Sequence, residues 1–203
     1  MDDVNDVQSG RAQRGHGLAF FNGFLKRPEQ VGSVIPSSRF LERRIIEVAE
    51  IVNARLVVEL GPGTGGTTQA ILDALPEDSR LLAIEISPEF VERLKAHSDP
   101  RLIVHRGSAE HIREALAIHG LSNPDVVISG IPFSTIPKFL GKRVISAVWS
   151  SLDNGGRFVA YQFRSRVASL GQELLGTPDT TLELLNVPPM RVYRWRKQAD
   201  ASR

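Results

Sequence analysis

The chain has 203 residues, of which 41% are hydrophobic and 24% are charged, and its formal net charge is only +2. This balance predicts one globular domain with a sizeable core and no strong overall field toward an anionic partner. No cysteine is present, so disulfides and thiolate metal sites are excluded. Because no apolar run approaches the roughly 20 residues of a membrane span, and the acidic start is unlike a signal peptide, we expect a water-soluble cytoplasmic protein.

The first 35 residues differ in texture from the rest of the chain. Residues 1–16 are polar and lack periodicity, which predicts a flexible tail. The segment 18–27, LAFFNGFLKR, then carries a stripe of leucines and phenylalanines next to two basic residues. This pattern is typical of an amphipathic helix in a membrane interface, although a lid packed on the sheet has the same pattern. We therefore expect residues 1–35 to form a tail plus a docking helix, and residues 36–203 to form the main domain.

Beyond residue 36 the hydrophobic pattern alternates between helical and strand periods. The first helix is marked by apolar residues from Leu41 to Val52, and Ser37 or Ser38 is placed to cap it. Five strands are then predicted, at 55–60, 80–86, 101–106, 125–130 and 155–163. Helices are expected between them, at 66–75, 87–97, 109–119 and 140–152. After another short helix, 181–187 and 191–197 flank two prolines and are predicted to form a closing hairpin.

Short apolar strands that alternate with amphipathic helices indicate a parallel sheet covered on both faces. We therefore predict an α/β fold with a doubly wound, mostly parallel seven-stranded sheet that ends in a C-terminal antiparallel hairpin. In an open sheet of this kind the ligand binds beyond the carboxyl ends of the strands. That rule places the loop 59–66, Glu85, Ser108 and the loop 129–134 along one edge.

The loop after the first strand, ELGPGTGG, fits two nucleotide-binding patterns at once. Gly61, Gly63 and Gly66 spell the G-x-G-x-x-G of a dinucleotide-binding turn. Glu59 followed by Gly61, Gly63 and Gly65 spells the E-x-G-x-G-x-G of an S-adenosylmethionine pocket. In both cases the glycines let the backbone turn sharply and approach a ligand closely.

Three features favour S-adenosylmethionine. Glu59 is an anion at the mouth of the loop, which suits a ligand with an ammonium group better than a pyrophosphate. The chain also leaves little room for the separate substrate domain of many dehydrogenases. The fourth strand ends in small and aromatic residues, 129–133, where a methyl acceptor has space. Glu85 suits the ribose hydroxyls of either ligand, so the dinucleotide alternative stays open at this point.

Together these motifs resemble the class I methyltransferases over roughly residues 35–197, which identifies 36–203 as a methyltransferase domain with a Rossmann-like fold. The resemblance implies S-adenosylmethionine as cofactor and S-adenosylhomocysteine as product. It implies that the glycine loop cradles the methionine and ribose portions, with Glu59 near the methionine end and Glu85 on the ribose hydroxyls. The other implied cofactor contacts are Gly61, Gly63, Gly65, Ile86 against the adenine, Ser108 and Ala109 beside the adenine amine, and Ser38. Many members have Asp where this chain has Ser108.

The loop SGIPF at 129–133 helps to distinguish two methyltransferase families that act on different methyl acceptors. The rRNA adenine dimethylases have an Asn-Leu-Pro-Tyr-type loop here, and this chain lacks the Asn that accepts from the target amine. Five longer stretches resemble the bacterial phospholipid N-methyltransferases: FFNGFLKRPEQVGSVIPSSRFL, VVELGPGTGGTTQAIL, VISGIPFSTIP, NGGRFVAYQF and PPMRVYRWRK. That resemblance implies stepwise methylation of phosphatidylethanolamine toward phosphatidylcholine. The alternative is an rRNA or other nucleic-acid adenine N6-methyltransferase, in which the basic clusters contact phosphate.

Three residues near strand ends are candidates for the acceptor chemistry. Tyr161 is expected to orient the amine or to accept its proton, although a core tyrosine bonded to the backbone fits the sequence equally well. Phe133, together with Tyr161, is expected to offer an aromatic face to the methylated ammonium, an interaction of about 0.5–2 kcal/mol. Ser129 completes the set, at the place where the dimethylases have Asn. The histidines show no metal-ligand spacing, so no metal is expected.

For partners, we expect a phospholipid substrate, an anionic membrane surface contacted through residues 18–27, no nucleic acid, and no required oligomer. The basic cluster at 191–197 either assists this docking or is an ordinary solvated edge strand. The protein is accordingly expected in the cytoplasm, peripherally attached to the inner face of the cytoplasmic membrane.

Overall fold

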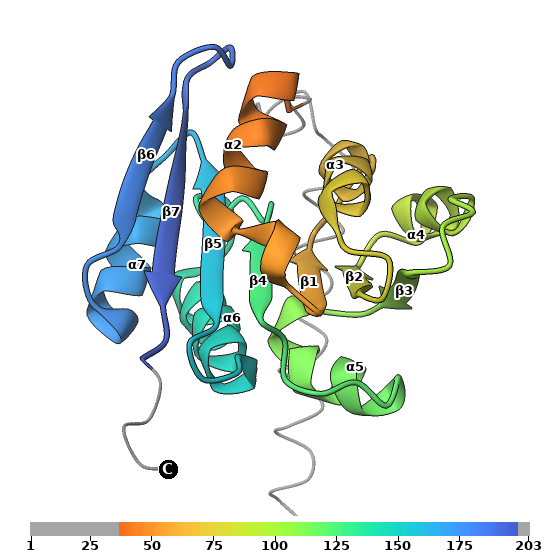
Figure 1. Ribbon diagram of the computed structural model, residues 1–203. Helices are drawn as coiled ribbons and strands as arrows, with labels where there is room; N and C mark the ends of the chain where they lie inside the picture. The colour runs from red at the N-terminus through yellow and green to blue at the C-terminus, as the bar shows by residue number, and fades with distance from the viewer. Residues whose placement is uncertain (1–36, 199–203) are drawn as a thin grey trace, which may run out of the picture.

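A computed structural model describes residues 37–198, which form one seven-stranded sheet covered by helices on both faces (Figure 1). The strand order is β3-β2-β1-β4-β5-β7-β6. The strands are β1 Leu56–Leu60, β2 Arg80–Glu85, β3 Leu102–Arg106, β4 Val126–Ser129, β5 Arg157–Gln162, β6 Asp179–Glu183 and β7 Met190–Arg196. β1 to β5 pair in parallel, whereas β7 is antiparallel to both β5 and β6. The predicted fold class, with its C-terminal antiparallel hairpin, is confirmed.

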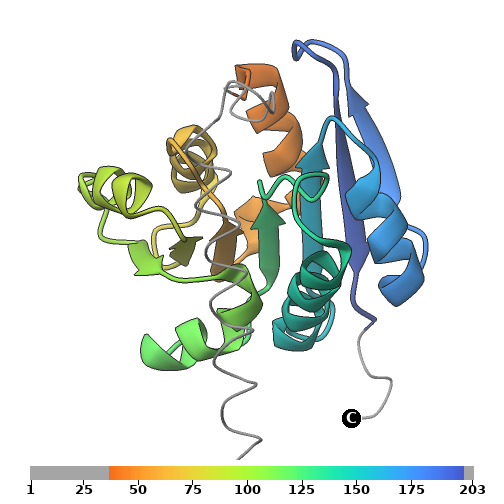
Figure 2. The same ribbon diagram turned by 180° about the vertical axis from the view of Figure 1, so that it is seen from behind.

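Helices connect the strands and form two layers (Figures 1 and 2). They are α2 Arg39–Ala49, η2 Ile51–Asn53, α3 Gly66–Ala74, α4 Pro88–Lys95, η3 Ala109–His111, α5 Ile112–Ile118, α6 Lys138–Ser151 and α7 Arg166–Leu175. α2 and α3 cover one face, and α5, α6 and α7 cover the other. Among the described residues, no helix is both long and apolar enough to span a bilayer.

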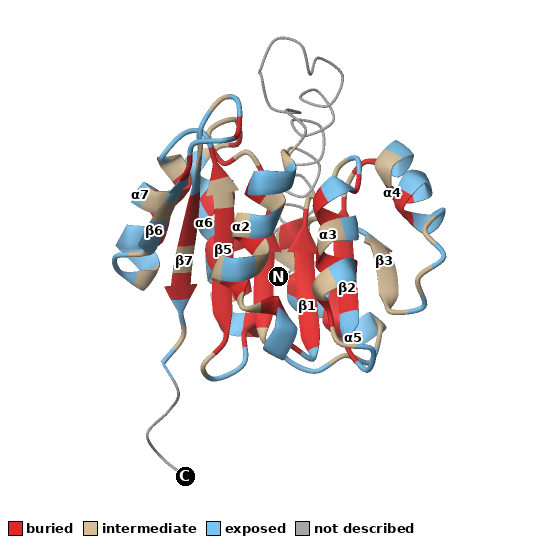
Figure 3. Ribbon diagram, turned by 45° about the horizontal axis from the view of Figure 1, so that its top comes forward, coloured by how far each residue is buried: buried red, intermediate tan, exposed pale blue. Residues whose placement is uncertain are grey.

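The core lies on both faces of the sheet because successive strand residues point to opposite sides. In β1, Val57 packs against the α2–α3 side, whereas Val58 packs against the α5–α7 side. The central strands β1 and β4 are buried along their whole length (Figure 3), as expected for a parallel sheet covered on both faces.

Two details of the predicted elements need correction. The helix expected at 109–119 begins with a 3₁₀ turn, and its α-helical part starts only at Ile112. The strand expected at 181–187 ends at Glu183, because residues 184–189 form the loop that connects β6 to β7. The predicted cap of α2 is found at Ser38, whose hydroxyl oxygen accepts from the backbone N–H of Leu41 at 3.2 Å.

The tail and the amphipathic segment 18–27 lie outside the described residues, so the expected division into 1–35 and 36–203 stays a prediction. At the start of the described chain, Ser37 and Ser38 make hydrogen bonds at the carboxyl edge of the parallel strands. The Ser37 hydroxyl lies 3.5 Å from the Thr67 hydroxyl in the first turn of α3. The backbone N–H of Ser38 donates to Asn186 Oδ1, in the β6–β7 loop, at 3.0 Å.

The contact between α7 and β7 yields a stability prediction. Gly171 lies against the indole of Trp195, which stacks on Phe158 with ring centroids 5.4 Å apart and donates its N–H to the Gly176 carbonyl at 2.8 Å. A methyl group at residue 171 would overlap the indole. Overpacking of this kind costs about 1–3 kcal/mol, which exceeds the ~0.5–1 kcal/mol that Ala gains over Gly in a helix.

We therefore expect Gly171→Ala to lower the free energy of unfolding by about 1–2 kcal/mol in a denaturant titration. The exposed neighbour Gln172→Ala, in the same helix, is the control and should leave the midpoint almost unchanged. Equal stability of the two variants would contradict the described packing.

Candidate functional site

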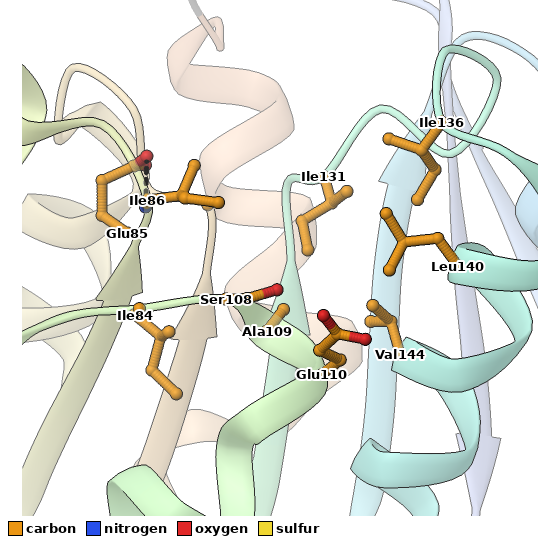
Figure 4. Close-up of a pocket in the computed structure, with 12 residues that line it drawn as sticks. Ile84, Glu85, Ile86, Ser108, Ala109, Glu110, Ile131, Ile136, Leu140 and Val144 are labelled. Atoms are coloured by element: carbon orange, nitrogen blue, oxygen red, sulfur yellow. Dashed lines mark hydrogen bonds between the residues drawn. The ribbon is translucent and has the colours of Figure 1, made fainter. Parts of the chain in front are cut away.

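A pocket lies beyond the carboxyl ends of the central strands, at the edge where parallel α/β sheets bind their ligands (Figure 4). The space between its lining residues, with the open mouth included, is about 520 Å³. The lining residues are Gly61, Ile84, Glu85, Ile86, Gly107, Ser108, Ala109, Glu110, Ile131, Ile136, Leu140 and Val144. Apolar side chains form most of the wall, and two carboxylates, Glu85 and Glu110, interrupt it.

Five of the expected cofactor residues line this pocket: Gly61, Glu85, Ile86, Ser108 and Ala109. Gly63 and Gly65 belong to the same loop without lining the pocket, and Glu59 is buried beneath the loop. Ser38 is not among the lining residues, because its hydroxyl caps α2.

The glycine loop turns with left-handed backbone angles and packs tightly on its neighbour. Gly61 has φ +67°, and a Cβ atom there would lie 3.1 Å from Cγ1 of Ile131. A residue with a side chain at this position would therefore have a strained backbone and would crowd Ile131 in the pocket wall. Gly65, with φ +90°, is the N-cap of α3, so the loop leads directly into a helix N-terminus, which favours anionic or electron-rich ligand groups.

Glu85 connects the end of β2 to the glycine loop. Its Oε2 accepts from the backbone N–H of Gly63 at 3.1 Å, and its Oε1 accepts from those of Ile86 and Ser87 at 2.8 Å each. Burial raises the pKa of this carboxyl, whereas the three backbone N–H bonds act in the opposite direction. A carboxylate offers about four acceptor positions. About one therefore remains for a ligand hydroxyl.

Glu59 is the most deeply buried acid of the site. Its Oε2 accepts a short hydrogen bond, 2.6 Å, from the Thr68 hydroxyl of α3, while its Oε1 is buried and has no hydrogen-bond partner among the described residues. Burial raises the pKa of Glu59 to about 7, an effect that the hydrogen bond from Thr68 reduces and the nearby charge of Glu85 increases. Buried polar atoms without partners are rare in native structures. The free oxygen fits a ligand that brings a cation or a donor.

The segment Ser108–Glu110, which follows β3, forms another part of the pocket wall. Sequence reasoning placed Ser108 where relatives often have Asp, and it missed Glu110 two residues later. The Glu110 carboxylate lines the pocket beside Val144 (Figure 4) and is paired with Arg143 at 2.9 Å. The signal was available in the sequence GSAEH, but only the 3₁₀ turn that starts at Ala109 brings the Glu110 side chain to the pocket.

The loop after β4 abuts the glycine loop at Gly130. A Cβ atom at Gly130 would lie 2.6 Å from Oη of Tyr161 and 3.0 Å from the carbonyl oxygen of Gly61. Both contacts require a residue without a side chain at this position. Gln162 holds the loop from the other side, since its side-chain amide donates to the Ile131 carbonyl. The ends of β1, β4 and β5 are therefore fixed against one another.

Tyr161 lies at this junction, with its Oη 3.2 Å from the Thr67 hydroxyl. Burial raises the pKa of Tyr161, and the neighbouring Glu59 adds to the shift. A phenol with a raised pKa stays neutral at physiological pH. Tyr161 is thus suited to orient an amine through its oxygen lone pairs and poorly suited to act as a phenolate base. Tyr161 packs against the core cluster and does not line the pocket, so its expected role in orienting the amine stays a prediction.

The structure corrects the role expected for Phe133. Its ring is fully buried in the core cluster with α6 and α7, close to Gly141, and it does not line the pocket. An aromatic face that other side chains enclose cannot be offered to a methylated ammonium. Ser129 is also fully buried, and its hydroxyl oxygen accepts from the backbone N–H of Ile131 at 3.3 Å. Its hydroxyl shapes the loop.

Metal ligation has no basis in the described part of the chain. No group of three or more His, Asp or Glu side chains is arranged to hold an ion there. His105 and His119 do contact each other, with 3.2 Å between Nδ1 and Nε2, but they form only a pair.

Comparison with known proteins places this arrangement in a family. No family model matches the sequence. The chain is 33% identical over 141 residues to the ornithine lipid N-methyltransferase of Singulisphaera acidiphila, a match that covers 68% of this chain and 73% of that enzyme. It is 28% identical over 165 residues to the ribosomal RNA small subunit methyltransferase A of Cutibacterium acnes, but it spans only 51% of that enzyme.

The fold has solved counterparts as well. One is the N-methyltransferase NodS from Bradyrhizobium japonicum in complex with S-adenosylhomocysteine, with a TM-score of 0.61 and 14% identity over 80% of this chain and 90% of that one. At this identity the likeness concerns the fold alone. The sequence match is the stronger result: the chain belongs to the class I methyltransferases, in the family that includes the ornithine lipid N-methyltransferase of S. acidiphila.

Proposed function

We propose that the protein methylates the primary amine of a membrane-lipid headgroup, with S-adenosylmethionine as methyl donor and S-adenosylhomocysteine as product. The observation that carries this proposal is the match to a lipid N-methyltransferase over 73% of that enzyme's length. The pocket supports the donor, because Glu85 offers an acceptor position to ribose hydroxyls. Glu59, buried beneath the glycine loop with one unsatisfied oxygen, adds a negative charge that favours a ligand with an ammonium group.

Two lipids share the acceptor chemistry. Phosphatidylethanolamine and ornithine lipids both present a primary amine on a short polar headgroup. The stretches quoted above favour phosphatidylethanolamine, methylated stepwise toward phosphatidylcholine, whereas the name of the S. acidiphila relative favours an ornithine lipid. The common substrate class is a lipid amine, and the experiment below separates the two lipids.

The residues of the chain contribute mainly by positioning. In the reaction the amine nitrogen bonds to the methyl carbon, the carbon–sulfur bond breaks, and the nitrogen then releases a proton. S-adenosylmethionine supplies the electrophilic methyl group. Holding two reactants in line corresponds to effective molarities of about 10⁵–10⁸ M. The loop junction at Gly130 and the neutral Tyr161 fix the acceptor side relative to the glycine loop.

The nucleic-acid alternative has less support. The rRNA methyltransferase of C. acnes is 28% identical and matched over 51% of its length, against 33% and 73% for the lipid N-methyltransferase. In addition, the loop after β4 has Ser129 and Gly130 where those enzymes are expected to have Asn, and the Ser129 hydroxyl is already bonded within the loop.

A lipid substrate also implies a place in the cell. We propose that the protein is a peripheral protein of the inner face of the cytoplasmic membrane. Segment 18–27, with its apolar stripe and adjoining basic residues, is one candidate contact with an anionic surface. The proposal needs neither a nucleic acid nor an oligomer.

The pKa of Glu59 makes cofactor binding pH-dependent. With a pKa of about 7, Glu59 is largely protonated below neutral pH, and a ligand with an ammonium group binds the charged form better. Below the pKa, binding must therefore expel a proton, at a cost of up to about tenfold in affinity per pH unit. We expect affinity for S-adenosylhomocysteine, measured by calorimetry, to rise between about pH 5.5 and pH 7 and then to level off.

The matched control is Glu59→Gln, which keeps the shape and the bond to Thr68 but cannot titrate. It should bind more weakly at pH 8 and show a flat profile between about pH 5.5 and pH 8. A profile that keeps its wild-type slope in this variant would remove Glu59 from the ammonium site.

The acceptor is tested with radiolabelled S-adenosylmethionine and three substrates offered separately. We expect label in phosphatidylethanolamine or in ornithine lipid, both dispersed in detergent, and none in total RNA. Label in only one of the two lipids identifies the acceptor. Label in RNA with neither lipid modified would refute the proposed function.

A further inference from the structure

The large apolar side chains that are exposed gather at one end of the molecule. Ten such residues are found in the described part of the chain. Three of them, Val52 in η2, Ile118 in α5 and Leu174 in α7, lie where these helices end, at the amino edge of the parallel strands. The other seven lie at or beyond the carboxyl edge, where the pocket is: Phe40, Phe139, Phe163, Leu182, Leu184, Leu185 and Val187.

Of these seven, the three most exposed lie in the loop between β6 and β7, residues 184–189, which we call the hairpin tip. Leu184 is 66% exposed, Leu185 62% and Val187 87%. Aliphatic side chains are usually buried, so three of them on one loop mark a contact surface. Figure 1 shows this loop as a projection beyond the sheet at the end where α2 begins.

Two polar side chains of this region, Asn186 and Glu183, are buried instead of exposed. Asn186 is buried between its neighbours: its Oδ1 accepts from the N–H of Ser38 and its Nδ2 donates to the carbonyl of Pro188 at 2.9 Å. Glu183 is buried too, with its Oε1 accepting from the N–H of Leu185 at 2.9 Å and its Oε2 3.4 Å from Nε of Arg44. Buried polar groups thus hold the loop in a shape that presents leucine and valine to the outside.

Basic residues surround the base of the hairpin tip. Arg191, at the start of β7, is exposed and donates to the carbonyl of Phe163 at 3.3 Å. Arg164, between β5 and α7, and Arg39, the first residue of α2, are exposed as well. Aliphatic side chains at an apex with arginines behind them match a bilayer whose headgroups are anionic.

The hairpin tip is also close to the acceptor side of the pocket. β7 pairs with β5 so that Val192 lies opposite Tyr161 and Arg191 opposite Gln162. The hairpin tip therefore extends past the same strand end that carries Tyr161. A bilayer in contact with the hairpin tip would bring lipid headgroups to the edge where the amine must be methylated.

We propose that the hairpin tip is a membrane-docking element, which inserts Leu184, Leu185 and Val187 between the lipids of an anionic bilayer while Arg191 and Arg164 contact the headgroups. The docking surface rests on the proposed function, because a lipid substrate gives the bilayer as the partner. It is distinct from segment 18–27, and it assigns a role to the residues that the sequence pattern placed in a strand.

The test is sedimentation of the full chain with vesicles of equal amounts of phosphatidylglycerol and phosphatidylcholine, neither of which has a primary amine. The tip variant is Leu184→Asp/Leu185→Asp/Val187→Asp. Since burying one aliphatic side chain changes an equilibrium by roughly tenfold, we expect its partition coefficient to fall at least about tenfold. The control Val52→Asp/Ile118→Asp/Leu174→Asp changes the same number of exposed apolar residues at the opposite edge and should bind as the wild type does.

A second variant, which reverses two charges, separates the electrostatic attraction to anionic headgroups from the insertion of apolar side chains. Arg164→Glu/Arg191→Glu should reduce binding to these vesicles, and the loss should disappear on vesicles of phosphatidylcholine alone or in high salt. Activity on a detergent-dispersed lipid amine should be unchanged in the tip variant, because the pocket is untouched. If the wild type methylates no lipid at all, the proposed function fails, while the sedimentation result still decides the docking role.

Three results would overturn the proposal. The first is wild-type vesicle binding by the tip variant. The second is a lower melting temperature of the tip variant without vesicles, which would show that another part of this chain covers the hairpin tip. The third is a dimer of the wild type that becomes a monomer in the tip variant, which would assign the surface to a second copy.

Discussion

The site depends on the close approach of two strand-end loops at Gly130. Parallel pairing of β4 with β1 and β5 brings their ends together, and the missing side chain at Gly130 leaves room there for both the Tyr161 hydroxyl and the Gly61 carbonyl. The cofactor side and the acceptor side are therefore one packed unit. Because protein interiors are close-packed, a change on one side is transmitted to the other as strain.

Electrostatics decides what this packed unit can bind. Two acids converge on the glycine loop, and they differ in how well they are satisfied. Glu85 is held by three backbone N–H groups, which oppose the rise in its pKa caused by burial and fix the loop. Glu59 has one donor, Thr68, and one unsatisfied oxygen, and its pKa of about 7 shows how costly its charge is when nothing compensates it. A cationic ligand relieves that cost, whereas a pyrophosphate would increase it.

Much of the fold and the cofactor side could be predicted from the sequence, because strand periodicity and the loop E-x-G-x-G-x-G are local signals. Glu85 could be predicted as a pocket residue because it lies at the carboxyl end of a predicted strand. The buried state of Phe133 could not be predicted, since an aromatic residue in a loop is equally compatible with the pocket wall and the core. The hairpin tip was missed for a related reason: its apolar residues continue the pattern of β6, and only the bonds of Asn186 show that they leave the sheet.

The central claim is that this pocket holds an S-adenosyl compound and no dinucleotide. Isothermal titration of the full chain with S-adenosylhomocysteine and, separately, with NADH tests it most directly. The account predicts saturable 1:1 binding of S-adenosylhomocysteine and no measurable heat with NADH. Saturable binding of NADH with none of the S-adenosyl compound would contradict it.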